Sequence, residues 1–395
     1  MQYRIDPKSG NRLSILGFGC MRFPRNMAQI DFSKTEGLVL RAVREGINYF
    51  DTAYIYGGSE ETLGRILQKH NLRDQVFLAS KLPTGKCREY GDFDRLFATQ
   101  LERLRTDRID YYLIHHLSDE SGWKKLCEMG IERWIRDQKK SERIGQIGFS
   151  FHGMQSEFMS LLDAYDWDFC QIQYNYIQTQ HQAGEAGLKR ASEKGLPVII
   201  MEPLLGGKLS VGLPKKALSL FAEERRELTP TAWALRWLWD QKEVTVVLSG
   251  MNDEMQIEEN RLTACSSECG ILSEREKKVY DEVREIFEAS YKFPCTECRY
   301  CMPCPHGVNI PGCFSAYNLS FTMGKVSGLQ QYVLSTGMAN PVKNHGAGRC
   351  TRCGRCEMHC PQHISIISSL VRVKKKMEPA WLRFGIRLYH LLTKP

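Results

Sequence analysis

The sequence contains no long hydrophobic run. No segment approaches the roughly 18 consecutive apolar residues that a membrane-spanning helix requires, and the first residues, MQYRIDPKSGNRLS, lack the apolar core of a secretory signal. We therefore expect a cytoplasmic protein. A large excess of one charge is also lacking, since the formal net charge is +8 over 395 residues and no nucleic-acid recognition motif accompanies it. A nucleic-acid partner is therefore not expected.

Cysteine is the residue in excess. The chain has 15 cysteines, and eight of them fall in two short clusters near the C-terminus. In a reducing compartment such clusters are typical of metal ligands rather than of disulfides. We interpret the seven scattered cysteines as buried free thiols; they are Cys20, Cys87, Cys127, Cys170, Cys265, Cys269 and Cys313.

Residues 13–265 alternate between short apolar segments and amphipathic ones. The apolar segments, predicted to be strands, cover 14–19, 47–50, 76–80, 109–115, 144–149, 167–174, 197–201 and 244–248. The amphipathic segments, predicted to be helices, cover 34–45, 59–69, 93–105, 122–136, 183–194, 230–240 and 253–263. This alternation predicts an α/β fold with a parallel sheet, and eight strands favour a closed (β/α)8 TIM barrel. An open doubly wound sheet is the alternative, but GFG in the first strand lacks the G-x-G-x-x-G spacing.

The composition divides the chain into four parts. We assign 1–272 to the barrel, 273–293 to a charged amphipathic linker helix, 294–368 to a small, mostly helical cysteine-rich domain, and 369–395 to a basic amphipathic tail. The apolar face of the tail favours packing on a domain or on a partner subunit of a homo-oligomer. Contact with a membrane surface is the less favoured interpretation.

Four polar residues stand at or just after the ends of three successive predicted strands: Asp51, Tyr56, Lys81 and His115. In a barrel these strand ends converge on one face, where active sites are built. A free phenol has a pKa of about 10, and a nearby ammonium lowers it. Tyr56 would then protonate a carbonyl oxygen while a hydride reaches the carbon, and a neutral His115 would donate a hydrogen bond to that oxygen.

The ordered motifs between residues 13 and 262 resemble the aldo-keto reductase family. They read GFGCMRFP, DTAYIYGGSEETLG, LASKLP, IDYYLIHH, GQIGFSFH, FCQIQYN, IMEPLLGGKL and LSGMNDEMQIEEN. The resemblance implies an oxidoreductase that uses NADPH or NADH on a small-molecule carbonyl substrate. It identifies Asp51, Tyr56, Lys81 and His115 as the catalytic tetrad, with Tyr56 as the acid–base and His116 as a competing assignment for the histidine.

The same resemblance implies contacts to the dinucleotide. Ser150 and Gln171 correspond to the residues that hold the nicotinamide carboxamide; the pyrophosphate and adenine contacts would come from Pro203, Leu204, Gly206, Glu259 and Asn260. The chain departs from the family pattern at Met201, where many members have an aromatic residue. It also departs at Gly250, Met251 and Gln256, where members that prefer NADPH carry cations. The choice between NADH and NADPH therefore stays open.

Two runs of cysteines form a second candidate functional site. Each offers four thiols at the spacing of [4Fe–4S] ligands, followed by proline: Cys295, Cys298, Cys301 and Cys304, then Cys350, Cys353, Cys356 and Cys360. The segments CPHGVNI and CPQHISI that follow the runs repeat one another. Zinc held by four cysteines is the alternative.

The runs resemble bacterial-type ferredoxins with two [4Fe–4S] clusters. The resemblance implies that the last cysteine of each run serves the other cluster, so that Cys360 joins the first three cysteines and Cys304 joins the second set. The first run departs from the pattern because only two residues precede Cys304, which leaves the role of this cysteine open. Helical segments at 311–321 and 327–335 indicate a helical variant of the ferredoxin domain.

Hydride transfer in the barrel and electron transfer by the clusters are not expected to exchange electrons directly. A hydride carries two electrons whereas each cluster carries one, so exchange between them would need a splitting cofactor such as a flavin, for which the sequence shows no motif. Three interpretations remain: structural clusters, electron exchange with an external carrier, or a barrel chemistry other than simple carbonyl reduction. An inactive barrel within an electron-transfer or binding module is the alternative function.

Overall fold

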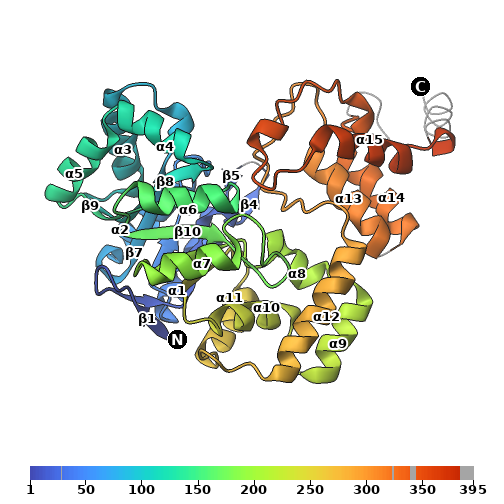
Figure 1. The fold of residues 1–395 in the computed structure, drawn as a ribbon, viewed down its shortest axis with the longest axis horizontal. Helices are drawn as coiled ribbons and strands as arrows, with labels where there is room; N and C mark the ends of the chain where they lie inside the picture. Colours follow the sequence, from blue (N-terminus) through green and yellow to red (C-terminus); the bar gives the residue numbers. More distant parts are fainter. Residues whose placement is uncertain (28, 323, 339–343, 383–395) are drawn as a thin grey trace. The chain divides into compact units, whose positions relative to one another are not determined.

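A computed structural model describes residues 1–27, 29–322, 324–338 and 344–382 of the chain (Figure 1). By their internal contacts these residues form two compact units. The first contains Met1–Leu204 and Thr231–Ser273, and the second contains Leu205–Pro230 and the described residues from Glu274 onward. The segment 205–230, which the sequence-based division places in the barrel, therefore packs with the cysteine-rich part.

The first unit is a closed barrel of eight parallel strands, which confirms the predicted fold class. In chain order the strands are β3 (Leu16–Gly19), β6 (Tyr49–Asp51), β7 (Phe77–Leu82), β8 (Ile109–Leu117), β9 (Ile144–Phe151), β10 (Phe169–Gln173), β11 (Val198–Met201) and β12 (Val244–Ser249). Each overlaps one of the eight predicted segments. Neighbours around the barrel are consecutive in the chain, and β12 pairs with β3 to close it.

Side chains along each strand alternate between the barrel interior and the outer layer. In β8, Tyr111 and Leu113 belong to an interior cluster, whereas Tyr112 and Ile114 pack in the layer between sheet and helices. Leu13 of the strand β2 (Arg12–Ser14) joins the interior cluster, and Asp6 accepts a hydrogen bond of 2.7 Å from the Tyr111 hydroxyl. The N-terminal hairpin of β1 (Tyr3–Ile5) and β2 thus closes the end where the barrel strands begin.

Helices cover the outside of the barrel. They are α1 (Phe32–Arg44), α2 (Ser59–Lys69), α3 (Tyr90–Leu104), α4 (Glu120–Glu128), α5 (Ile131–Lys140), α6 (Gln155–Ala164), α7 (Gly184–Glu193), α10 (Pro230–Trp239) and α11 (Glu254–Cys265). The predicted helix 122–136 is divided into α4 and α5, because Gly130 between them has a φ of 93° that a helix does not accommodate. Helix α6 escaped prediction, since it begins after Met154 without a capping side chain.

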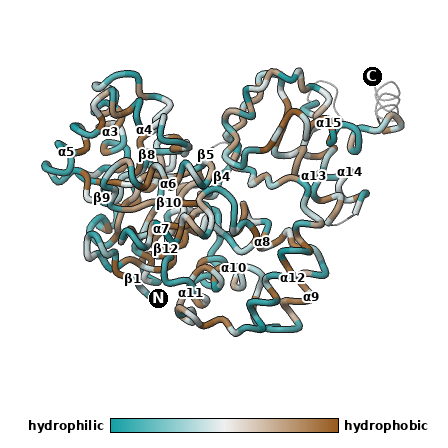
Figure 2. The backbone as a smooth tube through the Cα atoms, viewed as in Figure 1, coloured by the Kyte–Doolittle hydropathy of each residue, from teal (hydrophilic) through white to brown (hydrophobic). Residues whose placement is uncertain are grey.

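The second unit is mostly helical. Its elements are η4 (Leu205–Gly207), α8 (Lys208–Val211), α9 (Lys215–Glu224), α12 (Glu274–Ser290), α13 (Ile310–Thr322), α14 (Lys325–Thr336), η5 (Ala347–Arg349), η6 (Glu357–His359) and α15 (Ile366–Met377). Helix α12 falls within the predicted linker and buries one face, as its interleaved hydrophilic and hydrophobic residues in Figure 2 indicate. Its Tyr280 packs 6.0 Å, between ring centroids, from Phe221 of α9. Helices α13 and α14 match the two predicted helical segments.

The C-terminal tail begins within the helix α15, and its part from residue 383 onward lies outside the described residues. No helix in the described ranges combines the length and the apolar character needed to cross a membrane. Of the seven scattered cysteines, Cys265 and Cys269 are exposed, so the interpretation as buried thiols is wrong for them, and Cys127 is only half-buried. The two exposed cysteines lie at or beyond the end of α11, where the chain leaves the barrel surface.

The two helical glycines Gly64 and Gly37 give a test of packing between α2 and α3. A Cβ atom added at Gly64 would lie 2.4 Å from the Arg103 carbonyl oxygen, whereas one added at Gly37 would meet nothing within 4 Å. We expect Gly64→Ala to destabilise the barrel by about 1–3 kcal/mol and Gly37→Ala to stabilise it by about 0.5–1 kcal/mol. Thermal unfolding followed by tryptophan fluorescence measures this, since six of the seven tryptophans belong to the first unit. Equal effects of the two substitutions would contradict the packing.

Candidate active site and cysteine loops

Polar side chains occupy the inward positions that follow the interior cluster along the barrel strands. Tyr49, Ala79 and Leu113 line the barrel interior, and the next inward position on each of their strands is two residues later. These positions, with those on β9, β10 and β11, hold Asp51, Lys81, His115, Ser150, Gln171 and Met201. Every one of these side chains therefore comes from the carboxyl end of a strand, the end of a barrel at which enzymes bind substrates.

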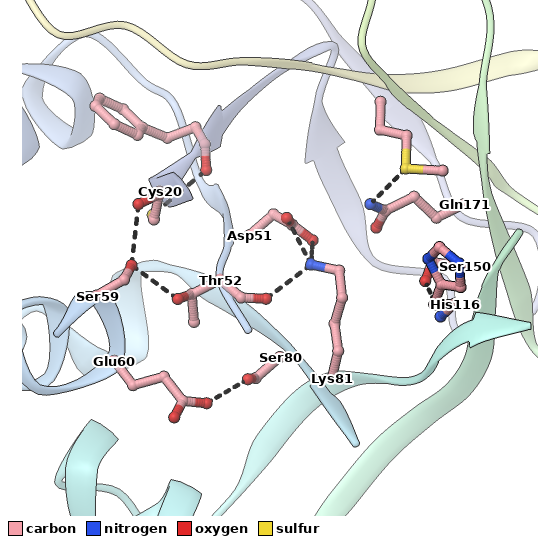
Figure 3. A network of polar contacts seen from close by, with 12 residues as sticks. Cys20, Asp51, Thr52, Ser59, Glu60, Ser80, Lys81, His116, Ser150 and Gln171 are labelled. Carbon is pink, nitrogen blue, oxygen red and sulfur yellow. Dashed lines mark hydrogen bonds and ion pairs between the residues drawn. The ribbon is translucent and has the colours of Figure 1, made fainter. Parts of the chain in front are cut away.

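Lys81 and Asp51 form a buried ion pair. The Lys81 Nζ atom lies 2.7 Å and 2.6 Å from the two carboxylate oxygens of Asp51 and donates a third hydrogen bond of 2.7 Å to the Thr52 carbonyl (Figure 3). The two side chains are 1% and 5% exposed. Burial raises the pKa of Asp51, and the charge and hydrogen bonds of Lys81 oppose this rise. All three protons of the ammonium are thereby occupied, so the group is fixed in place.

Tyr56 lies against both the lysine and the histidine. Its ring centroid is 5.3 Å from the Lys81 Nζ atom and 6.2 Å from the His115 ring, which it meets edge-on at 85°. The loop that carries Tyr56 is fixed across its base, because the hydroxyls of Thr52 and Ser59 are 2.9 Å apart and Ser59 donates to the Cys20 carbonyl at 3.0 Å (Figure 3). The four residues identified from the sequence are therefore brought together.

His115 is a buried imidazole. Burial lowers the pKa of His115 well below its usual value, and the charge of Lys81 and of two neighbouring histidines lowers it further. The ring is therefore neutral at physiological pH and can donate one N–H hydrogen bond. It is suited to polarise an oxygen atom, not to deliver a second proton.

The neighbouring His116 takes a different position. Its φ of 59° turns the backbone, and its N–H donates to the Ser150 hydroxyl at 2.9 Å. Its ring centroid is 4.8 Å from that of His152, whereas the contact with Tyr56 comes from His115. This geometry favours His115 over His116 as the tetrad histidine.

A further polar layer was not predicted from the sequence. His152 contacts the Gln182 carboxamide oxygen at 3.2 Å, and Gln182 donates to the Gln173 oxygen at 3.0 Å. The sequence contains part of this information. His152 follows Ser150 by two residues and Gln173 follows Gln171 by two, so the two-residue alternation of a strand predicts that each pair points to the same side. Gln182 lies in the loop after β10, which no period describes.

Glu60 is a second residue that the sequence did not reveal. It accepts hydrogen bonds from Ser80 at 2.6 Å and from Gln100 at 2.7 Å, and it pairs with Arg103 at 3.2 Å. Burial raises the pKa of Glu60, and these partners oppose the rise. The network joins α2 and α3 to β7, the strand that carries Lys81. Figure 3 shows its contact between Glu60 and Ser80.

Two of the predicted dinucleotide contacts present unsatisfied acceptors. Within the described ranges neither the Gln171 Oε1 atom nor the Asn260 Oδ1 atom has a hydrogen-bond partner, although both are buried. The Gln171 amide donates instead to the Met201 sulfur at 3.6 Å, and the Asn260 amide donates to Ser249 at 3.0 Å. Each carbonyl oxygen is thus free for an amino group of a ligand, and an unfilled buried acceptor is costly.

A cavity of about 560 Å³ lies beside Glu259. It is lined by Pro24, Arg25, Lys34, Asn252, Asp253, Met255, Gln256 and Glu259. Gly250 faces the Arg22 side chain, whose Cδ would lie 3.0 Å from an added Cβ. Cationic side chains therefore reach this region from the loop after β3. Pro203 and Leu204 follow β11 after Glu202, whereas Gly206 lies in η4 of the second unit.

In the second unit the cysteines of the two runs interleave. Cys295, Cys298, Cys301 and Cys360 line one cavity, which also includes Pro361. Cys304, Cys350 and Cys356 are half-buried and pack against the apolar core of the same unit. Among the described residues no three histidine, cysteine or acidic side chains converge as they would around a single metal ion. Cys295, Cys298, Cys301 and Cys360 surround a space, as the ligands of a multi-iron cluster do.

The comparisons with known proteins agree with this architecture. The model of the aldo/keto reductase family matches residues 15–268, and the model of the 4Fe-4S dicluster domain matches residues 294–365. The chain belongs to the aldo/keto reductase family. It is an oxidoreductase with an appended 4Fe-4S domain.

The relatives are distant. An uncharacterized oxidoreductase, YrpG, of Bacillus subtilis is 27% identical over 53% of this chain and 68% of its own length. The aldo-keto reductase yakc [NADP(+)] of Schizosaccharomyces pombe is 24% identical over 51% of this chain and 62% of its own, and L-galactose dehydrogenase of Arabidopsis thaliana is 25% identical over 73% and 95%. A solved holo-form aldo-keto reductase of Bacillus halodurans shares the fold, with a TM-score of 0.58, 22% identity and coverage of 72% of this chain and 96% of its own.

The buried state of His115 gives a pH prediction. Because the folded-state pKa of His115 is well below 6.5, its ring should remain neutral as the pH falls from about 8 to about 5.5. Carbon-13 NMR of histidine-labelled protein measures this, and the signal of His115 is assigned by its loss in His115→Gln. We expect the His115 signal to keep the shift of neutral imidazole throughout. A titration with a midpoint near 6.5 would contradict the proposed hydrogen-bond donor.

Proposed function

We propose that the barrel catalyses NAD(P)H-dependent reduction of a small-molecule aldehyde, ketone or sugar-like carbonyl, with Tyr56 as the general acid. The observation that carries this proposal is the buried Lys81–Asp51 pair beneath a half-buried Tyr56, next to a neutral His115. A fixed ammonium beside a phenol makes the phenol a better acid, which is the property that carbonyl reduction requires at neutral pH.

The residues divide the reaction between them. His115 donates a hydrogen bond to the carbonyl oxygen and orients it, and Tyr56 transfers its proton to that oxygen as the C=O bond becomes an alcohol. Lys81 stabilises the phenolate that remains, and Asp51 holds Lys81 in position. A bound reduced nicotinamide dinucleotide supplies the hydride to the carbon.

The chain offers partners for such a dinucleotide. The free Gln171 oxygen and the Ser150 hydroxyl suit the carboxamide of nicotinamide, and the free Asn260 oxygen suits the amino group of adenine. The cavity beside Glu259, with Arg25 and Lys34 in its lining, would receive the adenosine end. Arg25 and Lys34 are compatible with the extra phosphate of NADPH, and the name of the yakc relative specifies NADP(+).

Tyr56→Phe tests the catalytic role. The substitution keeps the ring between Lys81 and His115 but removes the proton, so we expect kcat to fall by at least about 100-fold while the affinity for NADPH or NADH is unchanged. Reduction of a panel of aldehydes, ketones and sugars is followed by the loss of NAD(P)H absorbance, and the affinity by fluorescence. Tyr54→Phe, in the same loop but packed against Arg103 at 4.3 Å, is the matched control that should retain activity.

Other outcomes would point elsewhere. An unchanged rate in Tyr56→Phe would exclude Tyr56 as the acid. A wild-type protein that binds neither dinucleotide and reduces nothing in the panel would favour the inactive barrel within an electron-transfer module.

For the second unit we propose two [4Fe–4S] clusters with exchanged fourth ligands. One would be held by Cys295, Cys298, Cys301 and Cys360, which line one cavity. The other would be held by Cys304, Cys350, Cys353 and Cys356, as the resemblance to bacterial-type ferredoxins implies. Cys353 is exposed, so the second cluster would lie close to the surface, where an external one-electron carrier can approach. No flavin is required if the clusters serve that carrier, since hydride transfer then proceeds separately in the barrel.

Iron content tests the ligand assignment. The intact protein, reconstituted without oxygen, should hold about eight iron atoms, four for each cluster. Cys360→Ala should reduce this to about four, whereas Cys313→Ala, which removes a buried thiol of the same unit outside the two runs, should leave it unchanged. Elemental analysis and the visible absorbance of the clusters are the measurements. Zinc in place of iron, or equal losses in both variants, would overturn the assignment.

A further inference from the structure

The segment after β11 is packed against the first cysteine run. Gly206 in η4 has a φ of 70°, and a Cβ atom added to it would lie 2.3 Å from the Thr296 carbonyl oxygen. The two backbones are therefore in direct contact, and Thr296 directly follows Cys295. Both residues belong to the second unit, so this contact is part of its internal packing.

Lys208, two residues further on, brings a buried positive charge to the same loop. Its side chain is 8% exposed, and its Nζ atom lies 2.7 Å from the Glu297 carboxylate and 5.8 Å from the Tyr291 ring centroid. Glu297, which Lys208 contacts, lies between Cys295 and Cys298 in the same loop. The charge of Lys208 thus lies beside the loop that carries the first two cysteines of the run.

Glu297 only partly cancels this charge. Its side chain is 40% exposed, whereas that of Lys208 is 8% exposed. Water screens the carboxylate more than the ammonium, because an interaction weakens as the local dielectric constant rises. The charge of Lys208 is therefore screened less than that of Glu297.

The second cysteine run has a buried carboxylate beside it, whereas its own basic residues Arg349, Arg352 and Arg355 are exposed to water. Glu378 is buried, accepts a hydrogen bond of 2.6 Å from the Tyr332 hydroxyl, and accepts another of 2.9 Å from the Gly348 backbone. Gly348 precedes Cys350 by two residues. A buried carboxylate therefore lies beside this loop, where the first loop has a buried ammonium.

These charges have opposite effects on a cluster. Reduction adds one electron to an iron–sulfur cluster, so a nearby cation stabilises the reduced state and a nearby anion destabilises it. We propose that Lys208 is a positioning residue that raises the reduction potential of the cluster bound by the Cys295 run above that of the other cluster. This inference rests on the two clusters of the proposed function. The cluster beside the η4 segment is then the one that retains an electron.

Redox titration of the holoprotein, followed by electron paramagnetic resonance, tests the inference. We expect two one-electron midpoints in the wild type. In Lys208→Met the higher one should fall, changing the oxidised-to-reduced ratio at the wild-type midpoint by about threefold or more, which equals about 28 mV for one electron. Lys208→Arg should restore the wild-type value, and the lower midpoint should stay constant in both variants.

Glu297→Gln separates charge from structure. It breaks the same ion pair but removes the negative partner, so the higher midpoint should rise instead of falling. Because Glu297→Gln retains Lys208, its effect on the higher midpoint still tests the inference if Lys208→Met fails to bind iron. Shifts of the same sign in Lys208→Met and Glu297→Gln, a shift of the lower midpoint, or no shift with both clusters intact would overturn the inference. A wild type without two titrating clusters would overturn the proposed cluster function instead.

Discussion

The two-residue period of a closed parallel barrel governs the arrangement of the first unit. Because the strands all run in one direction, their inward positions form successive layers, and each layer collects side chains from segments far apart in the chain. The inward positions nearer the amino ends of the strands are occupied by Tyr49, Ala79 and Tyr111, which belong to the interior apolar cluster. The next inward position of β6 or β7 is then both sheltered from water and open toward the strand ends. Only there can Asp51 and Lys81 pair without filling space that the core requires.

That pair is costly for stability. Removing two charges from water costs several kcal/mol for each ion, and the attraction between them offsets this only when the geometry is good and the remaining hydrogen bonds are satisfied. Here the three protons of Lys81 find Asp51 and the Thr52 carbonyl, so the requirement is met. The same burial that makes the pair costly keeps His115 neutral. One low-dielectric layer thus fixes the protonation states of several groups at once.

Periodicity explains how much could be predicted from the sequence. The barrel and the meeting of Asp51, Lys81 and His115 follow from eight apolar segments with polar residues at their ends, and both signals are local. Gln182 and Glu60 could not be found in this way, because their partners lie on other elements. The division of the helix 122–136 depends on the backbone of Gly130, which composition does not reveal. The packing of 205–230 with the cysteine-rich part has no periodic signature either.

That packing has a consequence for how the chain can be divided. Helix α9 lies between two barrel elements in sequence, yet its Phe221 packs on Tyr280 of α12, and Gly206 contacts the loop of Cys295. A chain cut after residue 273 would keep α9 but lose the surface that covers it. The iron–sulfur part is therefore not an exchangeable cassette joined by a linker. During synthesis the segment 205–230 leaves the ribosome well before its packing partners, and it must wait for them before the second unit can complete its core.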